Sequence, residues 1–332
     1  MGRFLHPEPV FTDPPPVDCA HFPPANATLK QSFAAGVCAC LAAVAIWGAQ
    51  MPVAKDSFAI LDPWVSTALR YVLALALLLP MLLLREGPSL LAAGRQWPWV
   101  AGLGVVGMSA SPLLVFSGMA MSRAEHAAVI VSLQPSIAAM LQWAIHRKRP
   151  SRITLGCIAL ALVGAVLVVT KGQLAFVHSR REMLGSLLIL AGAACWVFYT
   201  LGTPRLAGWS TWRVTLLTML AGGVSNVMAA TAAIAFGAVS PALTLEAVWE
   251  VRWVLVYLAY GGVVFAMLAW NYGAQRIGPV NASLFINFMP VMAFGVRALQ
   301  GVRFAPIELA GVALVVGALV ANNVLLRVLP SR

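Results

Sequence analysis

Ten long apolar stretches, separated by charged residues, proline or glycine, constrain this 332-residue chain more than any other feature. Each is close to the roughly 20 residues that a helix needs to cross the hydrocarbon core of a bilayer. Only 10% of the residues are charged and the mean hydropathy is +0.86, so the chain lacks the polar surface of a water-soluble globule. We therefore expect an all-α integral membrane protein with ten transmembrane helices. The stretches cover residues 33–54, 64–84, 98–121, 127–145, 154–170, 184–203, 213–236, 252–274, 279–299 and 307–327.

The second half of the chain repeats the first at a shift of 155 residues. The matched positions are Gly107 with Gly262, Gly118 with Gly273, Ala127 with Ala282, Pro135 with Pro290, Ala138 with Ala293, and Gly156 with Gly311. The predicted domains are a proline-rich, disordered cytoplasmic tail at 1–31 and five-helix repeats at 32–171 and 184–328. An odd number of helices per copy turns the second copy upside down in the bilayer. Two inverted five-helix repeats are typical of secondary transporters that work by alternating access.

The basic residues indicate topology rather than nucleic-acid binding. The net charge is +11, but lysine and arginine are scattered singly at the ends of the apolar stretches instead of forming a patch. More of them lie on the side of the N-terminus, which predicts that both termini are cytoplasmic. The segment with Lys171, Arg180 and Arg181 argues the other way. We expect a multi-pass protein of the inner (plasma) membrane.

Short motifs in both halves resemble the EamA branch of the drug/metabolite transporter superfamily. The first half has Trp47-Gly48, Lys55, Pro63, Arg70, Ser132-Leu133-Gln134-Pro135 and the stretch from Gly156 to Gly164; the second has Ala269-Trp270-Asn271, Phe288-Met289-Pro290 and the stretch from Gly311 to Gly317. The resemblance runs from about Phe33 to Arg327. It implies ten membrane helices and transport of small metabolites, with export the expected direction.

The chain departs from this family at the turn that follows the fourth helix and again after the ninth. Relatives commonly have a Gly-Glu-Arg-like sequence there, whereas this chain has Arg147-Lys148-Arg149 and Gly301-Val302-Arg303. The usual carboxylates are absent, and we find no other acid clearly at mid-span. The resemblance therefore gives no reason to expect that a carboxylate couples transport to protons in this chain.

Polar residues on one face of the fourth helix recur at equivalent places in the ninth. A lipid-facing stripe should be uniformly apolar, so Ser132, Gln134 and Asn287 predict a face that lines a cavity. Pro135 and Pro290 each remove a backbone hydrogen bond and predict bends in these helices. Two alternatives stay open: Ser132 could bond its own helix, and Asn287 could bridge neighbouring helices.

The first and sixth helices form a second pair of candidate faces, and the third and eighth a third pair. Their proposed cavity residues are Trp47, Gln50, Trp196, Tyr199, Ser109, Tyr260 and Asn271. Aromatic and amide groups without acids suit neutral, zwitterionic or anionic metabolites. Packing between helices accounts equally well for Trp47, Trp196 and Tyr199.

Two basic residues, Lys55 and Arg70, are predicted to attract a substrate carboxylate at the outer mouth. For Arg70 the alternative is that its side chain snorkels to the nearby interface. We expect no catalytic residues, cofactor or metal site, because the five cysteines lack metal-ligand spacing and no phosphate-binding loop is present.

The leading functional hypothesis is a secondary-active or facilitative carrier that exports amino acids or related metabolites. A membrane-embedded sensor or assembly protein stays open as an alternative, and an intramembrane enzyme is disfavoured because no catalytic set lies within the spans. The expected partners are the bilayer and a small-molecule substrate; nucleic acid is excluded, and a homodimer stays open.

Overall fold

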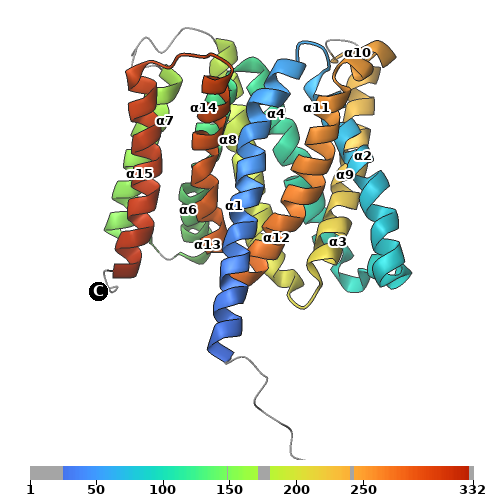
Figure 1. Ribbon diagram of the computed structural model, residues 1–332, viewed down its shortest axis with the longest axis horizontal. Helices are drawn as coiled ribbons and strands as arrows, with labels where there is room; N and C mark the ends of the chain where they lie inside the picture. The colour runs from blue at the N-terminus through green and yellow to red at the C-terminus, as the bar shows by residue number, and fades with distance from the viewer. Residues whose placement is uncertain (1–24, 148, 171–179, 240–242, 329–332) are drawn as a thin grey trace, which may run out of the picture.

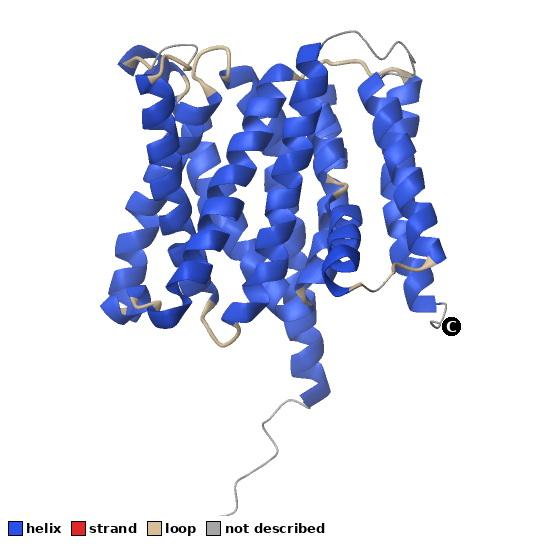
Figure 2. Ribbon diagram, turned by 180° about the vertical axis from the view of Figure 1, so that it is seen from behind, coloured by secondary structure: helices blue, strands red, loops and turns tan. Residues whose placement is uncertain are grey.

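The computed structural model describes residues 25–147, 149–170, 180–239 and 243–328, and this part of the chain forms helices and connecting loops without a strand (Figures 1 and 2). The start of α1 and the finish of α15 both lie on the lower side of the bundle in Figure 1. We call this side the terminal end, because α1 begins and α15 finishes there. α1 finishes and α15 begins at the opposite end.

Several bundle helices are continuous, whereas others consist of consecutive shorter pieces. The continuous helices are α1 (Ala25–Ser57), α2 (Pro63–Glu86), α7 (Arg152–Thr170), α8 (Arg180–Gly202), α9 (Thr211–Ala235) and α15 (Pro306–Val328). The composite ones are α3 (Trp97–Leu103), η4 (Gly104–Ala110) and α4 (Ser111–Met121); α5 (Ala124–Val131) and α6 (Gln134–His146); α11 (Arg252–Val256), η6 (Tyr257–Phe265) and α12 (Ala266–Ile277); and α13 (Pro279–Ser283), η7 (Leu284–Phe288) and α14 (Met289–Leu299). The connecting pieces are η2 (Pro88–Leu91), η3 (Gly94–Gln96), η5 (Thr203–Leu206) and α10 (Leu245–Glu250).

Within the described residues, nine helical segments are long and apolar enough to cross a membrane. They are Ser32–Ser57, Pro63–Leu84, Gly94–Met121, Ala124–Ala144, Arg152–Thr170, Arg180–Leu206, Thr211–Ala235, Arg252–Ile277 and Asn281–Leu299. They correspond to the first nine predicted stretches. The tenth stretch lies in α15, whose apolar segment Pro306–Ala318 is shorter.

The predicted disordered tail differs partly from the structure. Residues 1–24 lie outside the described part of the chain, but α1 already begins at Ala25, before the apolar stretch. Alanine, leucine, lysine and glutamine at 27–31 are good helix formers and extend the membrane helix toward the N-terminus.

Two irregular features occur at equivalent places in the two halves. The π-helical segments η4 and η6 both include a glycine of the repeat, Gly107 and Gly262. The helix break at Ser132–Leu133 and the 3₁₀ segment η7 also coincide under the 155-residue shift. π-Helical turns within α-helices often occur at functional sites, because they widen the helix and redirect its side chains.

Pairs of helices pack closely through glycine. The principal pairs are α7 with α15, α4 with α8, α1 with α12 and α2 with α9. Gly164 of α7 faces Gly311 of α15, and a Cβ atom on Gly164 would lie 2.7 Å from the Gly311 carbonyl oxygen. Small residues allow this approach between membrane helices, where apolar burial alone favours lipid as much as protein. The outward faces of the bundle carry exposed leucine, valine and phenylalanine, as a lipid-facing surface requires.

Candidate functional site

A cavity of about 100 Å³ lies inside the bundle, with walls from both halves of the chain. Its volume is sufficient for several water molecules. The lining residues are Trp47, Gln50, Met51, Arg70, Tyr71, Gly107, Ser111, Pro112, Val115, Phe116, Val131, Gln134, Trp196, Gly262, Val263, Met267, Ile286 and Met289. The set contains one charged residue, Arg70, and no carboxylate. The two π-helical segments contribute Gly107 and Gly262 to the lining.

α1 contacts the second half of the chain at Gly262, in the wall of the cavity. The Trp47 indole Nε1 donates to the Gly262 carbonyl oxygen at 2.8 Å, and the Gln50 side chain packs where a Cβ on Gly262 would be. A larger residue at 262 would displace the end of the Gln50 side chain from this position. Residues 47 and 50 share one face of α1, and this contact turns that face toward the cavity.

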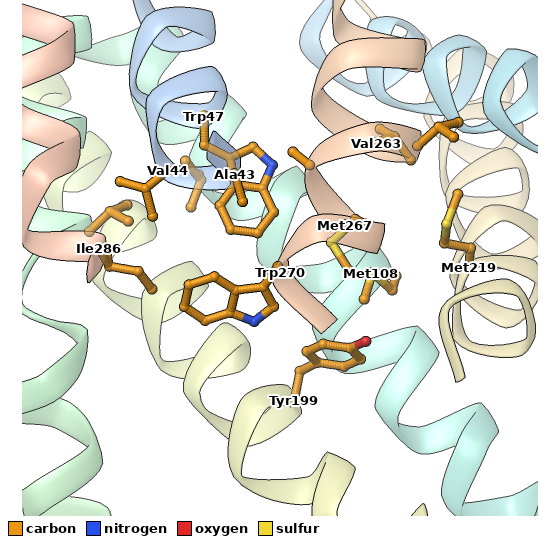
Figure 3. Packing of buried hydrophobic residues seen from close by; sticks show 14 of the residues in the cluster. Ala43, Val44, Trp47, Met108, Tyr199, Met219, Val263, Met267, Trp270 and Ile286 are labelled. Atoms are coloured by element: carbon orange, nitrogen blue, oxygen red, sulfur yellow. The ribbon is translucent and has the colours of Figure 1, made fainter. Parts of the chain in front are cut away.

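Aromatic rings border the cavity on the side of the terminal end. Trp47 makes an edge-to-face contact with Trp196, with ring centroids 5.2 Å apart, and Trp196 contacts Tyr199 at 5.3 Å. Trp270 lies 5.4 Å from Trp47, and Figure 3 shows the rings of Trp47, Trp270 and Tyr199 one below another. Such contacts each stabilise the packing by about 0.5–1.5 kcal/mol beyond apolar burial. The rings form a rigid apolar boundary.

Arg70 of α2 is buried in the cavity wall, with 4% of its surface exposed. Its guanidinium carbon lies 4.0 Å from the centre of the Phe116 ring and 5.6 Å from that of Tyr71. Its Nε has no hydrogen-bond partner, and among the described residues no carboxylate forms an ion pair with it. Two other cavity residues, Gln50 and Gln134, have buried side-chain oxygens without partners. The cavity wall thus contains both a hydrogen-bond donor and hydrogen-bond acceptors that have no partner in the protein.

An ion cluster lies between the cavity and the opposite end. Glu125, 1% exposed, accepts from Arg297 Nε at 3.3 Å and is 3.5 Å from Arg123 Nε. Arg123 also bonds Glu308 at 2.8 Å. We use the name ion cluster for Arg123, Glu125, Arg297 and Glu308. These side chains join α5, α14 and α15, because Arg123 immediately precedes α5 and Glu308 lies in the first turn of α15.

The end of α1 is attached to the same region by two weaker contacts. Asp56 lies 3.2 Å from Arg297 Nη1, but its side chain is 53% exposed. Lys55 Nζ donates to the Ala120 carbonyl oxygen at the end of α4, at 2.9 Å. The predicted mouth residues Lys55 and Arg70 therefore lie apart: Lys55 is near the opposite end and Arg70 lines the cavity.

The structure brings four of the predicted cavity residues to the cavity wall: Trp47, Gln50, Gln134 and Trp196. Tyr199 and Asn271 instead join helices. The Tyr199 hydroxyl donates to Asn271 Oδ1 at 3.1 Å, and Asn271 Nδ2 donates to Thr215 Oγ1 at 2.8 Å. This chain of bonds connects α8, α12 and α9.

The other predicted residues lie beside the cavity rather than on its lining. Ser132 donates to the Val129 carbonyl oxygen of its own helix at 2.6 Å. Asn287 is 1% exposed and both of its amide atoms lack partners. Ser109 is buried and Tyr260 is partly buried against the core.

The two prolines follow helix breaks instead of bending continuous helices. Pro135 is the second residue of α6 and Pro290 the second residue of α14, after the Ser132–Leu133 turn and the η7 segment respectively. At the start of a helix the missing N–H has no intrahelical acceptor, so proline is tolerated there. The interruption thus precedes each proline.

The sequence interpretation missed Glu125, Glu308, Ser111 and Phe116. Glu125 and Glu308 each lie at the start of an apolar stretch, where a carboxylate is usually a solvated end residue. Their burial depends on arginines far away in the chain, and Arg297 is the partner of Glu125 across 172 positions. One sequence feature could have indicated the cluster: both acids lie at stretch ends that the predicted topology places on the same side of the membrane.

A bundle of long apolar helices around a small cavity with unpartnered polar groups defines a multi-pass membrane protein. The chain belongs to the EamA-like transporter family, because the model of that family matches residues 34–170 and again 183–324.

Relatives in bacteria and archaea match most of the chain. The chain is 30% identical over 294 residues to the uncharacterized transporter YrdR of Bacillus subtilis, covering 87% of this chain and 91% of that protein. It is 27% identical to the uncharacterized transporter YyaM of the same species, covering 84% and 90%. An uncharacterized transporter of Archaeoglobus fulgidus is 23% identical, over 74% and 82%. These names indicate a transporter rather than an enzyme.

A solved crystal structure shares the fold. It superposes with a TM-score of 0.65, covers 91% of this chain and 99% of that chain, and is 22% identical in sequence.

Proposed function

We propose that the chain is a secondary-active or facilitative transporter that exports small metabolites, such as amino acids or related compounds, by alternating access. The observation that carries the proposal is the internal cavity: both halves line it, and it contains buried polar atoms of Gln50, Arg70 and Gln134 without protein partners. Unsatisfied buried polar groups are unfavourable in a folded protein and are expected where a ligand completes them. Membership in a transporter family supports the same conclusion.

The proposed architecture is ten transmembrane helices in two inverted five-helix repeats. Two matches of one family model support a duplication, as do the π-helical and broken segments that recur at a constant shift. In such transporters the substrate site lies at the repeat interface near the middle of the membrane, and interrupted helices form it.

The proposed orientation places both termini in the cytoplasm and the protein in the inner membrane. Arg205, Arg213 and Arg276 at the terminal end lie over aromatic rings, as expected for cations anchored at an interface. At the opposite end, Arg252 lies over Trp249 in the same way. The orientation therefore rests on the number of lysines and arginines, which is greater on the side of the termini and favours the cytoplasm for that side.

Alternating access would require the two boundaries of the cavity to open in turn. On the terminal side, the contacts among Trp47, Trp196 and Trp270 would separate. On the opposite side, the ion cluster would separate. The cavity lining includes no carboxylate, so coupling to protons through an acid in the cavity is not part of the proposal.

Cysteine accessibility tests the transport path. In a variant without the native cysteines, Gln134→Cys is expected to react with a water-soluble maleimide in membrane vesicles. Leu184→Cys, at a position that is 48% exposed on the outer face of α8, is the matched lipid-facing control and is expected to stay unreacted. Equal inertness at both positions would contradict a water-accessible path.

Transport itself is tested with the purified protein in proteoliposomes loaded with radiolabelled amino acids, nucleosides or amphipathic drugs. We expect protein-dependent counterflow of at least one of these. Failure of the whole panel would favour a sensor or assembly role.

A further inference from the structure

The buried guanidinium of Arg70 is the most unusual charge in the part of the chain that the structure describes. Arginine stays protonated at all physiological pH values, so burial leaves a full positive charge in the cavity wall. A buried charge is strongly unfavourable unless an opposite charge or several hydrogen bonds compensate it. No carboxylate on the lining supplies that compensation.

The groups around Arg70 leave its N–H groups free to bind a ligand. Phe116 faces the guanidinium at 4.0 Å, and a ring stacked in this way stabilises the cation without using its hydrogen bonds. Ser66 and Thr67, four and three residues earlier on α2, are buried hydroxyls that also lack partners. α2 thus presents a cation next to unused hydroxyl donors.

The other lining residues indicate the polarity and the charge of the ligand that fits the cavity. Trp47 and Trp196 supply large apolar surfaces, and Gln50 and Gln134 supply two amide groups. The planar guanidinium matches a carboxylate through two parallel hydrogen bonds. The single buried cation fits one negative charge better than two.

We propose that Arg70 binds the carboxylate of a small monocarboxylate substrate whose remainder is apolar or aromatic. The inference rests on the proposed transport function, since it specifies the ligand of the same cavity. It moves the attraction of the carboxylate from an outer mouth to the cavity itself. Lys55, bonded to the end of α4, then belongs to the support of the opposite end.

Matched acids and amides test the inference as a binding measurement on the purified protein in detergent. The probes are benzoate against benzamide and indole-3-acetate against indole-3-acetamide, at pH 7, with the shift in the thermal unfolding midpoint as the readout. We expect the acids to stabilise the wild type at concentrations about 10- to 100-fold lower than the amides, because the amides replace the ion pair between guanidinium and carboxylate with a hydrogen bond from the guanidinium to an uncharged oxygen.

The variant Arg70→Gln should bind the acid and the amide of each pair equally, whereas Arg70→Lys should keep part of the preference for the acid. Arg205→Gln removes an exposed arginine that lies over Trp99, and should leave the preference unchanged. A wild type without preference for the acids, or an Arg70→Gln variant that retains it, would overturn the inference.

Three further results distinguish carboxylate binding from lipid binding and from transport. Stabilisation by dihexanoylphosphatidylglycerol but by neither carboxylate would assign the guanidinium to a lipid phosphate and overturn the inference. Arg70-dependent binding without counterflow of any compound in proteoliposomes would refute the transport function while leaving the carboxylate site standing. Counterflow of neutral compounds that is unaffected by Arg70→Gln, together with no preference for acids, would refute the carboxylate site while leaving the transport function standing.

Discussion

The variant Glu125→Gln is expected to open the cavity toward the opposite end. Glu125 is almost completely buried, and its carboxylate bonds Arg297 and Arg123, which each keep a second acidic partner. Replacing the carboxylate by an amide removes its negative charge, so the two ion pairs become, at best, hydrogen bonds from a charged arginine to an uncharged amide oxygen. If these contacts form only while the opposite end is closed, their loss shifts the equilibrium toward the open state.

The size of the shift follows from burial. Removing the charge of one partner of a buried ion pair costs about 3–5 kcal/mol, and the hydrogen bond that the amide oxygen keeps from Arg297 offsets about 1.5–3 kcal/mol of this, so the net loss is about 2 kcal/mol. That corresponds to about a 30-fold change in the ratio of open to closed molecules. Asp56 bonds the same Arg297 but is 53% exposed, and solvent-exposed pairs contribute at most about 1 kcal/mol, or about fivefold. Asp56→Asn is therefore the matched control.

The assay measures the rate at which a membrane-impermeant maleimide, added on the side of the opposite end, labels Gln134→Cys in a cysteine-free background. We expect Glu125→Gln to raise this rate about 30-fold and Asp56→Asn to raise it less than about fivefold. Equal rates for the two variants would refute the reasoning that burial decides which contact holds this end closed. A lower rate in Glu125→Gln would refute the assignment of the ion cluster to the closed state.

Two further predictions concern stability. Gly164→Ala should lower the thermal midpoint by an amount that corresponds to about 1–3 kcal/mol, because its Cβ would lie 2.7 Å from the Gly311 carbonyl oxygen. Gly156→Ala on the same helix is the control: its Cβ would meet no atom within 4 Å, so this change should be neutral or stabilising. Equal effects of the two substitutions would contradict glycine-mediated packing of α7 on α15. Tyr199→Phe should destabilise the protein by about 1 kcal/mol, because the hydrogen bond to Asn271 is lost, and should leave the maleimide labelling of Gln134→Cys unchanged. A large change in labelling with normal stability would instead indicate that Tyr199 lines the transport path.

Much of the fold could be predicted from the sequence, because membrane helices carry a local signal. A stretch of about 20 apolar residues must satisfy its backbone internally, so its length and composition predict a helix without knowledge of its neighbours. The first nine predicted stretches coincide with the helical segments that are long enough to cross a membrane. Family membership, expected from motifs such as Trp47-Gly48, is confirmed by the match of the EamA-like model.

The candidate site was only partly predictable. Trp47 and Gln50 were placed on one face of a helix by their spacing, and the structure turns that face to the cavity. Tyr199 and Asn271 had equally good cavity spacing, yet they bond each other between α8 and α12. Helical periodicity identifies residues that share a face but does not tell whether that face meets a cavity or another helix.

The membrane class, the helix positions and the repeated pattern can therefore be predicted from the amino-acid sequence, since each of these depends on residues that are near one another or related by a constant shift. The partners of the charged residues become visible only in the folded chain. It buried Arg70 next to Phe116 without a carboxylate and joined Glu125 to Arg297 from the other half of the chain. A charge in a membrane protein is stabilised by whatever lies beside it in space, and that neighbour is set by how the helices pack.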